Sequence, residues 1–419
     1  MKEVVFILLF ITFPLSIFSQ DTLIWKKRII HLGVVKRIEI NDNEDIIAHN
    51  INNLVHLRDT SGIYIRDLDY SEGDVNAIEF ANNELIYFPS YDKTFNTIAI
   101  LCYNIKNQVI TNVFEPGVLT GYENVCDISV SKDNSKLAAL FQLSDDDRKS
   151  FKIIIWDINT MQLLYNLDYS GDAKINKIEF LENRIFFNIN NEIVYYDLST
   201  NSLLKPFEND PLMHKSEIKD FSFNDDQRYI ASVDYDGVCN IWDLSNYTIT
   251  KSFIPIENTT KLSLVEWGRD DNYLIFADNS NHYITKYNLS QQSIVNSFIE
   301  SDSTIFDFEI SKDKERLYFC DGINIFKLKL DYRKAISVNE ERLYNRKIFP
   351  IPFHDDLNIE NINNDNLRIQ IIDLSGRIII DQTTSSALIC ISTSNLPVGN
   401  YFIKVQKNNT FYIEKIMKN

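Results

Sequence analysis

Residues 232–244 read SVDYDGVCNIWDL, and the fold class follows from the pattern of these thirteen residues. Apolar and polar residues alternate on both sides of Asp236-Gly237, which is the period of a β-strand. An Asp-Gly pair between two such runs is a strong signal for a tight hairpin turn. The second run ends on Trp242-Asp243, an aromatic residue followed by an aspartate. The stretch therefore predicts two antiparallel strands joined by a short turn.

This pattern belongs to a repeat that runs through most of the chain. Seven alternating runs occur at intervals of about 40 to 50 residues. They are 36–40, 75–80, 125–130, 175–180, 218–223, 262–267 and 305–310. Short polar turns follow them, as at 131–134, 224–227 and 311–314, where Asp and Asn side chains can bond back to the backbone. A repeat of this length predicts a propeller, a solenoid or an array.

The composition also favours strands over helices. The chain of 419 residues contains 27 Phe and 21 Tyr, and such side chains pack well on a pleated sheet. No helical period of adequate length competes with the alternation. We therefore expect an all-β fold.

The stretch at 232–244 resembles the second half of a WD repeat, with its Asp-Gly turn and Trp-Asp ending. The resemblance covers residues 21–335 and implies a seven-bladed β-propeller, in which four-stranded blades surround a central channel. Residues 23–29 would form the outer strand of the last blade, which closes the ring and removes an exposed sheet edge. The family's Gly-His dipeptide is absent, so the sequence does not predict the hydrogen-bond network around that histidine.

Residues 348–419 have a different character, with alternating runs separated by Pro, Ser-Gly and Gly-Asn turns. Four blocks resemble, in order, the type A sorting domain of the type IX secretion system of Bacteroidota-like bacteria. The residues that carry the resemblance are Pro350, Pro352, Asp373, Gly376, Arg377, Leu396, Gly399, Tyr401, Lys404 and Lys415. The resemblance implies a small immunoglobulin-like β-sandwich that directs the chain through the outer membrane by the type IX machinery. Ile351 departs from the family, which usually has Asn there, and an ordinary immunoglobulin-like appendage is the structural alternative.

Residues 1–20 predict a signal peptide. A charged start precedes an apolar run at 4–18, which is shorter than the roughly 20 residues that a membrane span needs. No later segment is long and apolar enough to span a bilayer. The predicted organisation is a signal peptide at 1–20, a propeller at 21–335, a linker at 336–347 and a sorting domain at 348–419. The mature protein would be secreted or displayed on the cell surface, by way of the periplasm.

The net charge bears on the class of partner, and the cysteine spacing bears on whether disulfides form. The formal net charge is -17, and an acidic surface repels phosphate backbones, so nucleic acid is not an expected partner. Five cysteines are widely scattered with no C-x-x-C spacing. This pattern favours buried structural thiols over disulfides.

The sequence lacks the common motifs for catalysis, cofactor binding and metal binding. The chain has no G-x-S-x-G, no phosphate-binding glycine loop and no H-E-x-x-H. His49 and His56 could approach each other on one blade, but a metal site needs three or four ligands. The acidic runs at 41–45 and 145–147 lack the spacing of a calcium loop and are interpreted as a hairpin turn and a solvated loop. We expect no cofactor and no enzymatic activity.

Binding is the leading functional hypothesis. The long connections 89–96, 115–124, 143–150 and 208–217 are expected on one face, and insertions on one face commonly mark the binding side. The candidate binding residues in them are Tyr91, Phe95, Pro116, Tyr122, Met213 and His214. Such a face would bind a protein or a glycan; alternatively, these side chains fold back over neighbouring blades.

A hydrolase or lyase of extracellular polymers, with its site at the channel mouth, is the second hypothesis. Convergent Asp, Glu, Tyr or Arg groups with perturbed pKa values would favour the enzyme. An apolar or aromatic rim would favour binding.

Overall fold

The structure is a computed structural model of the chain. The residues it describes are 22–29, 33–92, 97–117, 122–145, 148–169, 173–208, 210–256, 261–280, 282–298, 303–332, 348–349, 352–360, 366–373, 377–407 and 410–418. The chain divides into two compact units, Ser19–Tyr332 and a unit made of Met1–Phe18 with Arg333–Asn419. The predicted signal peptide and linker lie outside the described residues.

Within the described residues, the unit Ser19–Tyr332 forms seven four-stranded antiparallel sheets. The first two sheets contain β2 (Ile38–Ile40), β3 (Ile46–Ile51), β4 (Leu54–Asp59), β5 (Tyr64–Leu68), and β6 (Glu79–Phe80), β7 (Leu85–Asp92), β8 (Thr97–Asn104), β9 (Val109–Phe114). The third and fourth contain β10 (Tyr122–Val130), β11 (Lys136–Asp145), β12 (Arg148–Asp157), β13 (Leu163–Tyr169), and β14 (Ile178–Leu181), β15 (Arg184–Ile189), β16 (Glu192–Asp197), β17 (Ser202–Leu204).

The remaining three sheets complete this unit. The fifth and sixth contain β18 (Ile218–Phe223), β19 (Tyr229–Asp234), β20 (Cys239–Asp243), β21 (Thr248–Phe253), and β22 (Leu262–Trp267), β23 (Tyr273–Asp278), β24 (Tyr283–Asn288), β25 (Ser293–Phe298). The seventh contains β26 (Asp307–Ile310), β27 (Arg316–Cys320), β28 (Asn324–Lys329) and β1 (Thr22–Arg28). One 3₁₀ turn, Arg269–Asp271, links β22 to β23.

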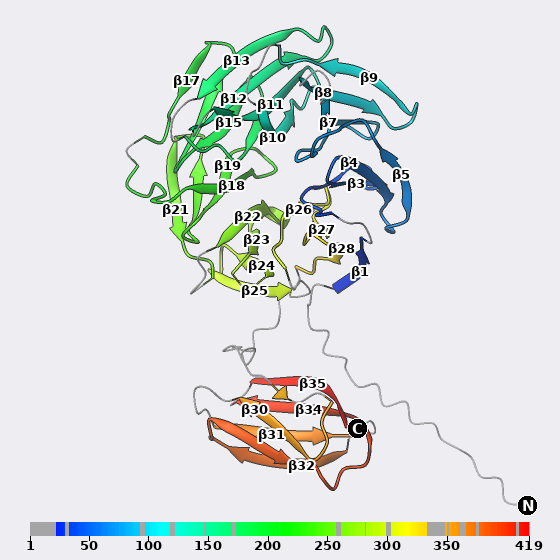
Figure 1. The fold of residues 1–419 in the computed structure, drawn as a ribbon. Coiled ribbons are helices and arrows are strands. Elements are labelled where there is room, and N and C mark those ends of the chain that lie inside the picture. The colour runs from blue at the N-terminus through cyan, green and yellow to red at the C-terminus, as the bar shows by residue number, and fades with distance from the viewer. Residues whose placement is uncertain are drawn as a thin grey trace, which may run out of the picture. The chain divides into compact units, whose positions relative to one another are not determined.

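Apolar side chains join these sheets into a closed cycle. Each of seven buried clusters in the described residues combines side chains from two consecutive sheets. The cluster that closes the cycle packs Ile38 and Ile47 of the first sheet with Tyr318 and Ile325 of the seventh. Figure 1 shows the sheets following one another around this unit, from blue through green to yellow. The arrangement is β-propeller-like, as the repeat predicts.

The predicted closing strand is confirmed. β1 pairs antiparallel with β28, and Leu23 lies opposite Leu328 while Arg28 lies opposite Asn324. The last sheet is therefore built from both ends of this unit. Because β1 covers the outer side of β28, that strand is not left as an open edge.

The polar turns between the first and second strands of the sheets also form as predicted. In the third sheet the Ser131 hydroxyl accepts a hydrogen bond from the backbone N–H of Lys136, at 2.9 Å. The fifth sheet has Asn224 in the same role, with the N–H of Tyr229 at 2.7 Å. These side chains replace backbone partners that a tight turn leaves unsatisfied.

Two predicted loops are instead extended hairpins. The expected connection 89–96 belongs in part to β7, which continues to Asp92 and pairs with Thr97 of β8. The expected connection 143–150 is mostly strand, because β11 and β12 continue pairing as far as Asp145 and Arg148. Residues that were expected in the loops alternate as strand residues do, so the strands are longer and the loops shorter than predicted. Of the acidic run at 145–147, residues 146 and 147 lie outside the described residues.

The cysteines lie mainly in strands. Cys239 and Cys320 are buried in β20 and β27, as predicted, and Cys102 is buried in β8. Cys126 is half-buried in β10, and Cys390 is exposed. Burial raises the pKa of Cys239 and Cys320 well above the ordinary range, so both are protonated thiols at neutral pH.

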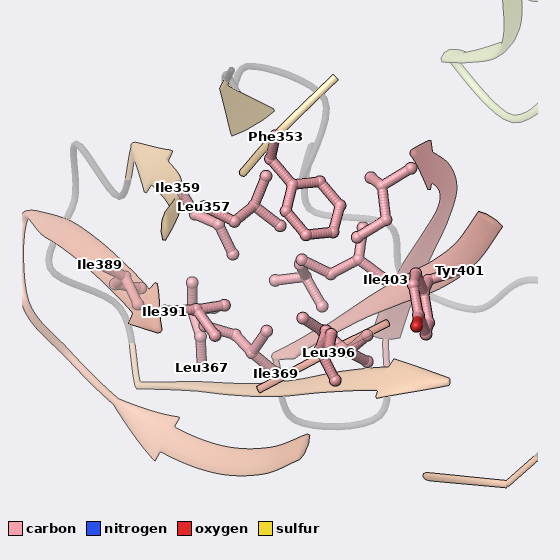
Figure 2. Packing of buried hydrophobic residues seen from close by; sticks show 13 residues of the cluster. Phe353, Leu357, Ile359, Leu367, Ile369, Ile389, Ile391, Leu396, Tyr401 and Ile403 are labelled. Carbon is pink, nitrogen blue, oxygen red and sulfur yellow. The ribbon is translucent and has the colours of Figure 1, made fainter. Parts of the chain in front are cut away.

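The C-terminal unit contains two sheets over one core. One sheet has the order β29-β30-β33 and the other β32-β31-β34-β35. Their bounds are β29 (Ile348–Phe349), β30 (Asp356–Glu360), β31 (Leu367–Ile372), β32 (Ile378–Thr384), β33 (Leu388–Ser392), β34 (Gly399–Lys407) and β35 (Thr410–Lys418). Figure 2 shows Leu357, Ile369 and Ile403 pointing into this core from the two sheets, together with Phe353 from the residues just before β30.

Candidate functional site

A cavity of about 850 Å³ lies at the centre of the seven sheets. Most of its lining residues belong to the first, innermost strand of each sheet or to the segment that leads into that strand; Gln142 of β11 and Phe151 of β12 are among the exceptions. The volume is within the range of small-molecule sites, about 300 to 1,000 Å³. The sequence predicted a central channel but could not tell which carboxylates converge on it.

Charged side chains line the cavity in two layers. The seven runs have equivalent positions when the first is counted from Val35, and their third and fifth positions carry most of the charge. The third positions are Arg37, Ala77, Asp127, Lys177, Asp220, Leu264 and Asp307. The fifth positions are Glu39, Glu79, Ser129, Glu179, Ser222, Glu266 and Glu309, and we call their five glutamates the glutamate layer.

The aspartates of the third position hold neighbouring sheets together. Each accepts a hydrogen bond from a backbone N–H of the next sheet: Asp127 from Ile178 at 2.8 Å, Asp220 from Val265 at 2.8 Å, and Asp307 from Ile38 at 3.0 Å. The last of these bonds again joins the seventh sheet to the first. These aspartates therefore have a structural role.

The cations of the third position cross between sheets. The guanidinium of Arg37 donates to the carbonyl oxygen of Asn76, at 2.8 Å, in the segment that leads into the second sheet, and to that of Cys126, at 2.7 Å, in β10 of the third sheet. Its nearest described carboxylate partner, Asp307, is 3.9 Å away. The described hydrogen bonds of the Arg37 guanidinium therefore go to backbone carbonyl oxygens and not to carboxylates of the glutamate layer.

Lys177 behaves differently, because its ammonium sits among carboxylates. Its Nζ is 3.2 Å from Asp220, 3.9 Å from Glu266 and 4.0 Å from Glu179. Burial opposes the charge, but these carboxylates outweigh it and raise the pKa of Lys177 well above its ordinary value. Lys177 is therefore a protonated ammonium at neutral pH.

The glutamate layer holds protons more tightly than free carboxylates do. Burial in the cavity, aided by neighbouring carboxylates, raises the pKa of Glu79 to about 8 and that of Glu179 to about 8. Burial and the repulsion of Glu309 raise the pKa of Glu39 well above its usual range. The Asp307 carboxyl is shifted less, to a pKa of about 6, again mainly by burial. The layer is therefore partly protonated at pH 7.

The predicted binding face does not form as an exposed apolar rim in the described residues. Pro116 and His214 are buried, and Tyr91 and Met213 are half-buried against the clusters of their own sheets. Phe95 lies outside the described residues, and only the backbone of Tyr122 is described, in β10. The four described side chains thus fold back onto the sheets, which was the alternative interpretation. The physical reason is local packing: Tyr91 and Met213 contact apolar clusters of their sheets, and the His214 ring centroid is 5.9 Å from that of Trp242.

His214 belongs to a buried hydrogen-bond network. Its Nδ1 is 2.9 Å from a carboxylate oxygen of Asp234, and its Nε2 is 2.7 Å from the hydroxyl of Ser232. The indole N–H of Trp242 donates to the same hydroxyl, at 2.7 Å. Because Ser232 accepts from Trp242, its own O–H is available to His214, whose Nδ1–H then donates to Asp234.

This network corrects two expectations. The missing Gly-His dipeptide gave no reason to expect such a network, yet Met213-His214 supplies the histidine twenty residues before Asp234. His214 is also not a surface residue, because its side chain is fully inaccessible. The available signal was a histidine shortly before the run at 218–223.

His49 and His56 do lie side by side, as the sequence suggested. They face each other across β3 and β4, with ring centroids 5.2 Å apart. His49 accepts from Arg58, at 3.1 Å, and His56 contacts Asp67, at 2.5 Å. Nε2 of His49 and Nδ1 of His56 thus each have a protein partner.

The residues of the predicted sorting motif lie at turns and in strands of the C-terminal unit. Asp373 and Arg377 close one turn, with Oδ2 and Nε 3.2 Å apart. Tyr401 is buried in the core with Leu396, and its hydroxyl donates to the carbonyl oxygen of Pro397 at 2.7 Å. The others are placed as follows: Gly399 and Lys404 lie in β34, the backbone of Lys415 lies in β35, Pro352 is exposed before β30, and Pro350 and Gly376 lie outside the described residues.

No helix among the described residues is long and apolar enough to cross a membrane. A search of curated proteins returned no match to the chain.

Two protein families do match. Residues 212–243 match the WD domain, G-beta repeat, and these residues contain the whole network of His214, Ser232, Asp234 and Trp242. Residues 347–419 match the secretion system C-terminal sorting domain. Such a tail indicates export to the cell surface or the medium. The chain is a WD-repeat-like protein that carries a type IX secretion system C-terminal sorting domain.

Proposed function

We propose that this protein is an exported ligand-binding protein whose ligand enters the central cavity. In this proposal residues 1–20 are a signal peptide of a Bacteroidota-type cell, the seven sheets are the blades of one propeller, and the C-terminal sheets form an immunoglobulin-like sandwich. The sorting domain would deliver the propeller to the cell surface or the medium.

The observation that carries the proposal is the charged cavity of about 850 Å³. A structural channel filled by apolar side chains would leave no such space, whereas polar groups that converge on a cavity of this size are typical of a binding site. The predicted face of loops gives weaker support, since its described side chains pack inwards. A protein or a glycan is still the partner that we propose for that face. Binding there would need the residues in the outermost turns of the face to contact the partner.

Filling the cavity tests the proposal. Ser222 has a small side chain in the same layer as the glutamates, and Ser222→Leu would reduce the available space. Ser199→Leu, at an exposed position, is the matched control. We expect the full-length wild type and the control to retain the same molecules from culture medium, identified by mass spectrometry, and S222L to lose them. Equal retention by all three proteins would place the ligand elsewhere.

Export is tested separately. Deletion of residues 396–419 removes β34 and β35, two of the four strands of the larger C-terminal sheet. We expect the truncated protein to stay inside the outer membrane when cells are fractionated, while the wild type reaches the surface or the medium. Release of the truncated protein in normal amounts would contradict the sorting role.

An enzyme acting on extracellular polymers is a second candidate, and one observation favours it. Glu79 and Glu179 both have a pKa of about 8, so each is a protonated carboxylic acid at neutral pH, as a general acid must be. Turnover of soluble polysaccharides by the wild type, lost in Glu79→Gln or Glu179→Gln, would support this candidate. Binding without turnover would leave ligand binding as the function.

A further inference from the structure

The larger C-terminal sheet, β32-β31-β34-β35, has one face over the core and one outer face. Ile369 and Ile371 of β31 point to the core and are fully buried. When the other face of an antiparallel sheet is solvated, its residues are normally polar. One end of the outer face follows this rule, because Arg368 and Gln370 both donate hydrogen bonds to Asp381 there. That end has the surface expected of a sheet in water.

The other end of the outer face is apolar. Ile372 of β31 lies opposite Ile378 of β32 on one side and opposite Phe402 of β34 on the other. Met417 of β35 is diagonal to Phe402, because it pairs with Asn400, two residues earlier in β34. We call Ile372, Ile378, Phe402 and Met417 the apolar row. Its members come from all four strands of the sheet.

The apolar row is accessible at the surface. Ile378 is 48%, Phe402 36% and Met417 42% exposed, and Ile372 is half-buried. The sequence places apolar residues on both faces here, as in the run 378–380, where a solvated strand would alternate. The core of this unit does not need these side chains, since they point away from it. Exposed apolar side chains that gather in one patch mark interaction sites.

The position of the sorting motif is an independent observation. Asp373 and Arg377 lie in the turn between β31 and β32, next to the apolar row. Lys415 lies opposite Phe402, and Gly399 begins the same strand. The match to a secretion system sorting domain spans residues 347–419 and so includes the whole row. A sorting domain acts through a protein that binds it, and the motif residues lie at the same end of the sheet as the row.

The residues around Phe402 indicate the chemistry of the partner. Aromatic residues and Met are enriched in the cores of protein interfaces, and the row supplies one of each between aliphatic side chains. The neighbouring positions on this face are basic, with Lys415 opposite Phe402 and Lys404 two residues after it. In a symmetric pair of copies these like charges would lie at one margin, which disfavours a second copy as the occupant.

We propose that the apolar row is the surface by which the type IX machinery binds this chain. The partner is a protein of that machinery, and it presents an apolar patch bordered by acidic groups. The inference rests on the sorting role of the C-terminal unit and does not depend on what the central cavity binds.

Substitution of the row tests the proposal in cells that contain the type IX machinery. The full-length double variant Ile378→Thr with Phe402→Thr keeps strand-forming residues but removes the apolar surface. The matched control, Leu388→Thr with Cys390→Thr, changes two exposed residues of β33 in the smaller sheet. We expect about tenfold less of the first variant at the surface and in the medium, because an aromatic anchor carries much of the energy of an interface. The control should be exported like the wild type.

Melting of the purified full-length proteins, followed by circular dichroism, shows that export and not folding is affected. Both replaced side chains are accessible, so the melting temperature should stay close to that of the wild type. Normal export of the I378T and F402T double variant would overturn the proposal. If the deletion of 396–419 still traps the chain in that case, the sorting role holds and only the surface is wrong. Normal export of the deletion as well would refute the sorting role itself.

Photo-cross-linking identifies the occupant and does not depend on the stability of the double variant. A benzophenone analogue of phenylalanine replaces Phe402 in the full-length chain, and in the control it replaces exposed Leu388. After irradiation of cells, we expect an adduct at position 402, identified by mass spectrometry as a component of the type IX machinery, and no such adduct at 388. An adduct with a second copy of this chain would make the row a dimer interface and overturn the proposal. The same adduct at both positions, or none at 402, would also overturn it.

Discussion

Replacement of Glu179 by Gln gives a direct test of proton storage in the cavity. The folded protein holds the pKa of Glu179 at about 8, compared with 4.5 for the unperturbed group. A group whose pKa is higher in the folded state binds more protons there, so the folded state loses stability as the pH rises from about 4.5 to about 8. Gln cannot ionise, and E179Q should lack this loss.

The magnitude follows from the shift and from the exposure of the side chain. At 1.36 kcal/mol for each pKa unit, the shift corresponds to at most about 5 kcal/mol. The Glu179 side chain is 32% exposed to the cavity, and water there screens the charge, so we expect about 1 to 2 kcal/mol. E179Q should therefore match the wild type at pH 5 and exceed its free energy of unfolding by this amount at pH 9.

Urea denaturation followed by tryptophan fluorescence suits the measurement. All four tryptophans, Trp25, Trp156, Trp242 and Trp267, lie in the unit Ser19–Tyr332, so the signal reports this unit and not the C-terminal one. Glu182→Gln is the control, because Glu182 is 76% exposed in the turn of the same sheet. A difference between E179Q and the wild type that is the same at pH 5 and pH 9 would refute the reasoning.

Three further predictions concern stability, and the first two use the same unfolding assay. Lys177→Met leaves three carboxylates without their ammonium and should destabilise the protein by about 2 kcal/mol at pH 8. The loss should be smaller at pH 5, where Glu179 is protonated. Equal losses at pH 5 and pH 8 would contradict the pairing of Lys177 with these carboxylates. Ser232→Ala removes the hydroxyl shared by His214 and Trp242 and should cost about 2 kcal/mol, whereas exposed Ser199→Ala should cost almost nothing. Tyr401→Phe should lower the stability of the C-terminal unit by about 1 kcal/mol, seen by circular dichroism, through loss of the bond to Pro397, and an unchanged melting temperature would argue against that bond.

The sequence carried most of the information on the strands, because their alternation is local. It also indicated the closing strand, since 23–29 occupies the same place before the first repeat that 248–253 occupies before the sixth. The loops at 89–96 and 143–150 are shorter than the sequence predicts. Alternation of apolar and polar residues indicates a strand but not the residue where it ends, because the end depends on pairing with the neighbouring strand.

The cavity was harder to predict, since its lining comes from seven segments spread over about 270 residues of chain. A signal was nevertheless present: Arg37 with Glu39, Lys177 with Glu179, and Asp307 with Glu309 place charges at alternate positions of otherwise apolar runs. Charges at positions that would normally pack a core indicate a polar interior. Which of them pair, and which keep their protons, depends on distances between sheets that no single run contains.

The pairing of β1 with β28 has a consequence for how the unit folds. Arg28 and Asn324 are neighbours in space but roughly 300 residues apart in the chain, and contacts of such long range form late in folding. The other six sheets can each assemble from consecutive segments. We therefore expect the seventh sheet to be completed last, and its outer strand to detach first during unfolding. The detachment rate of these seven residues would then set the kinetic lifetime of the whole ring.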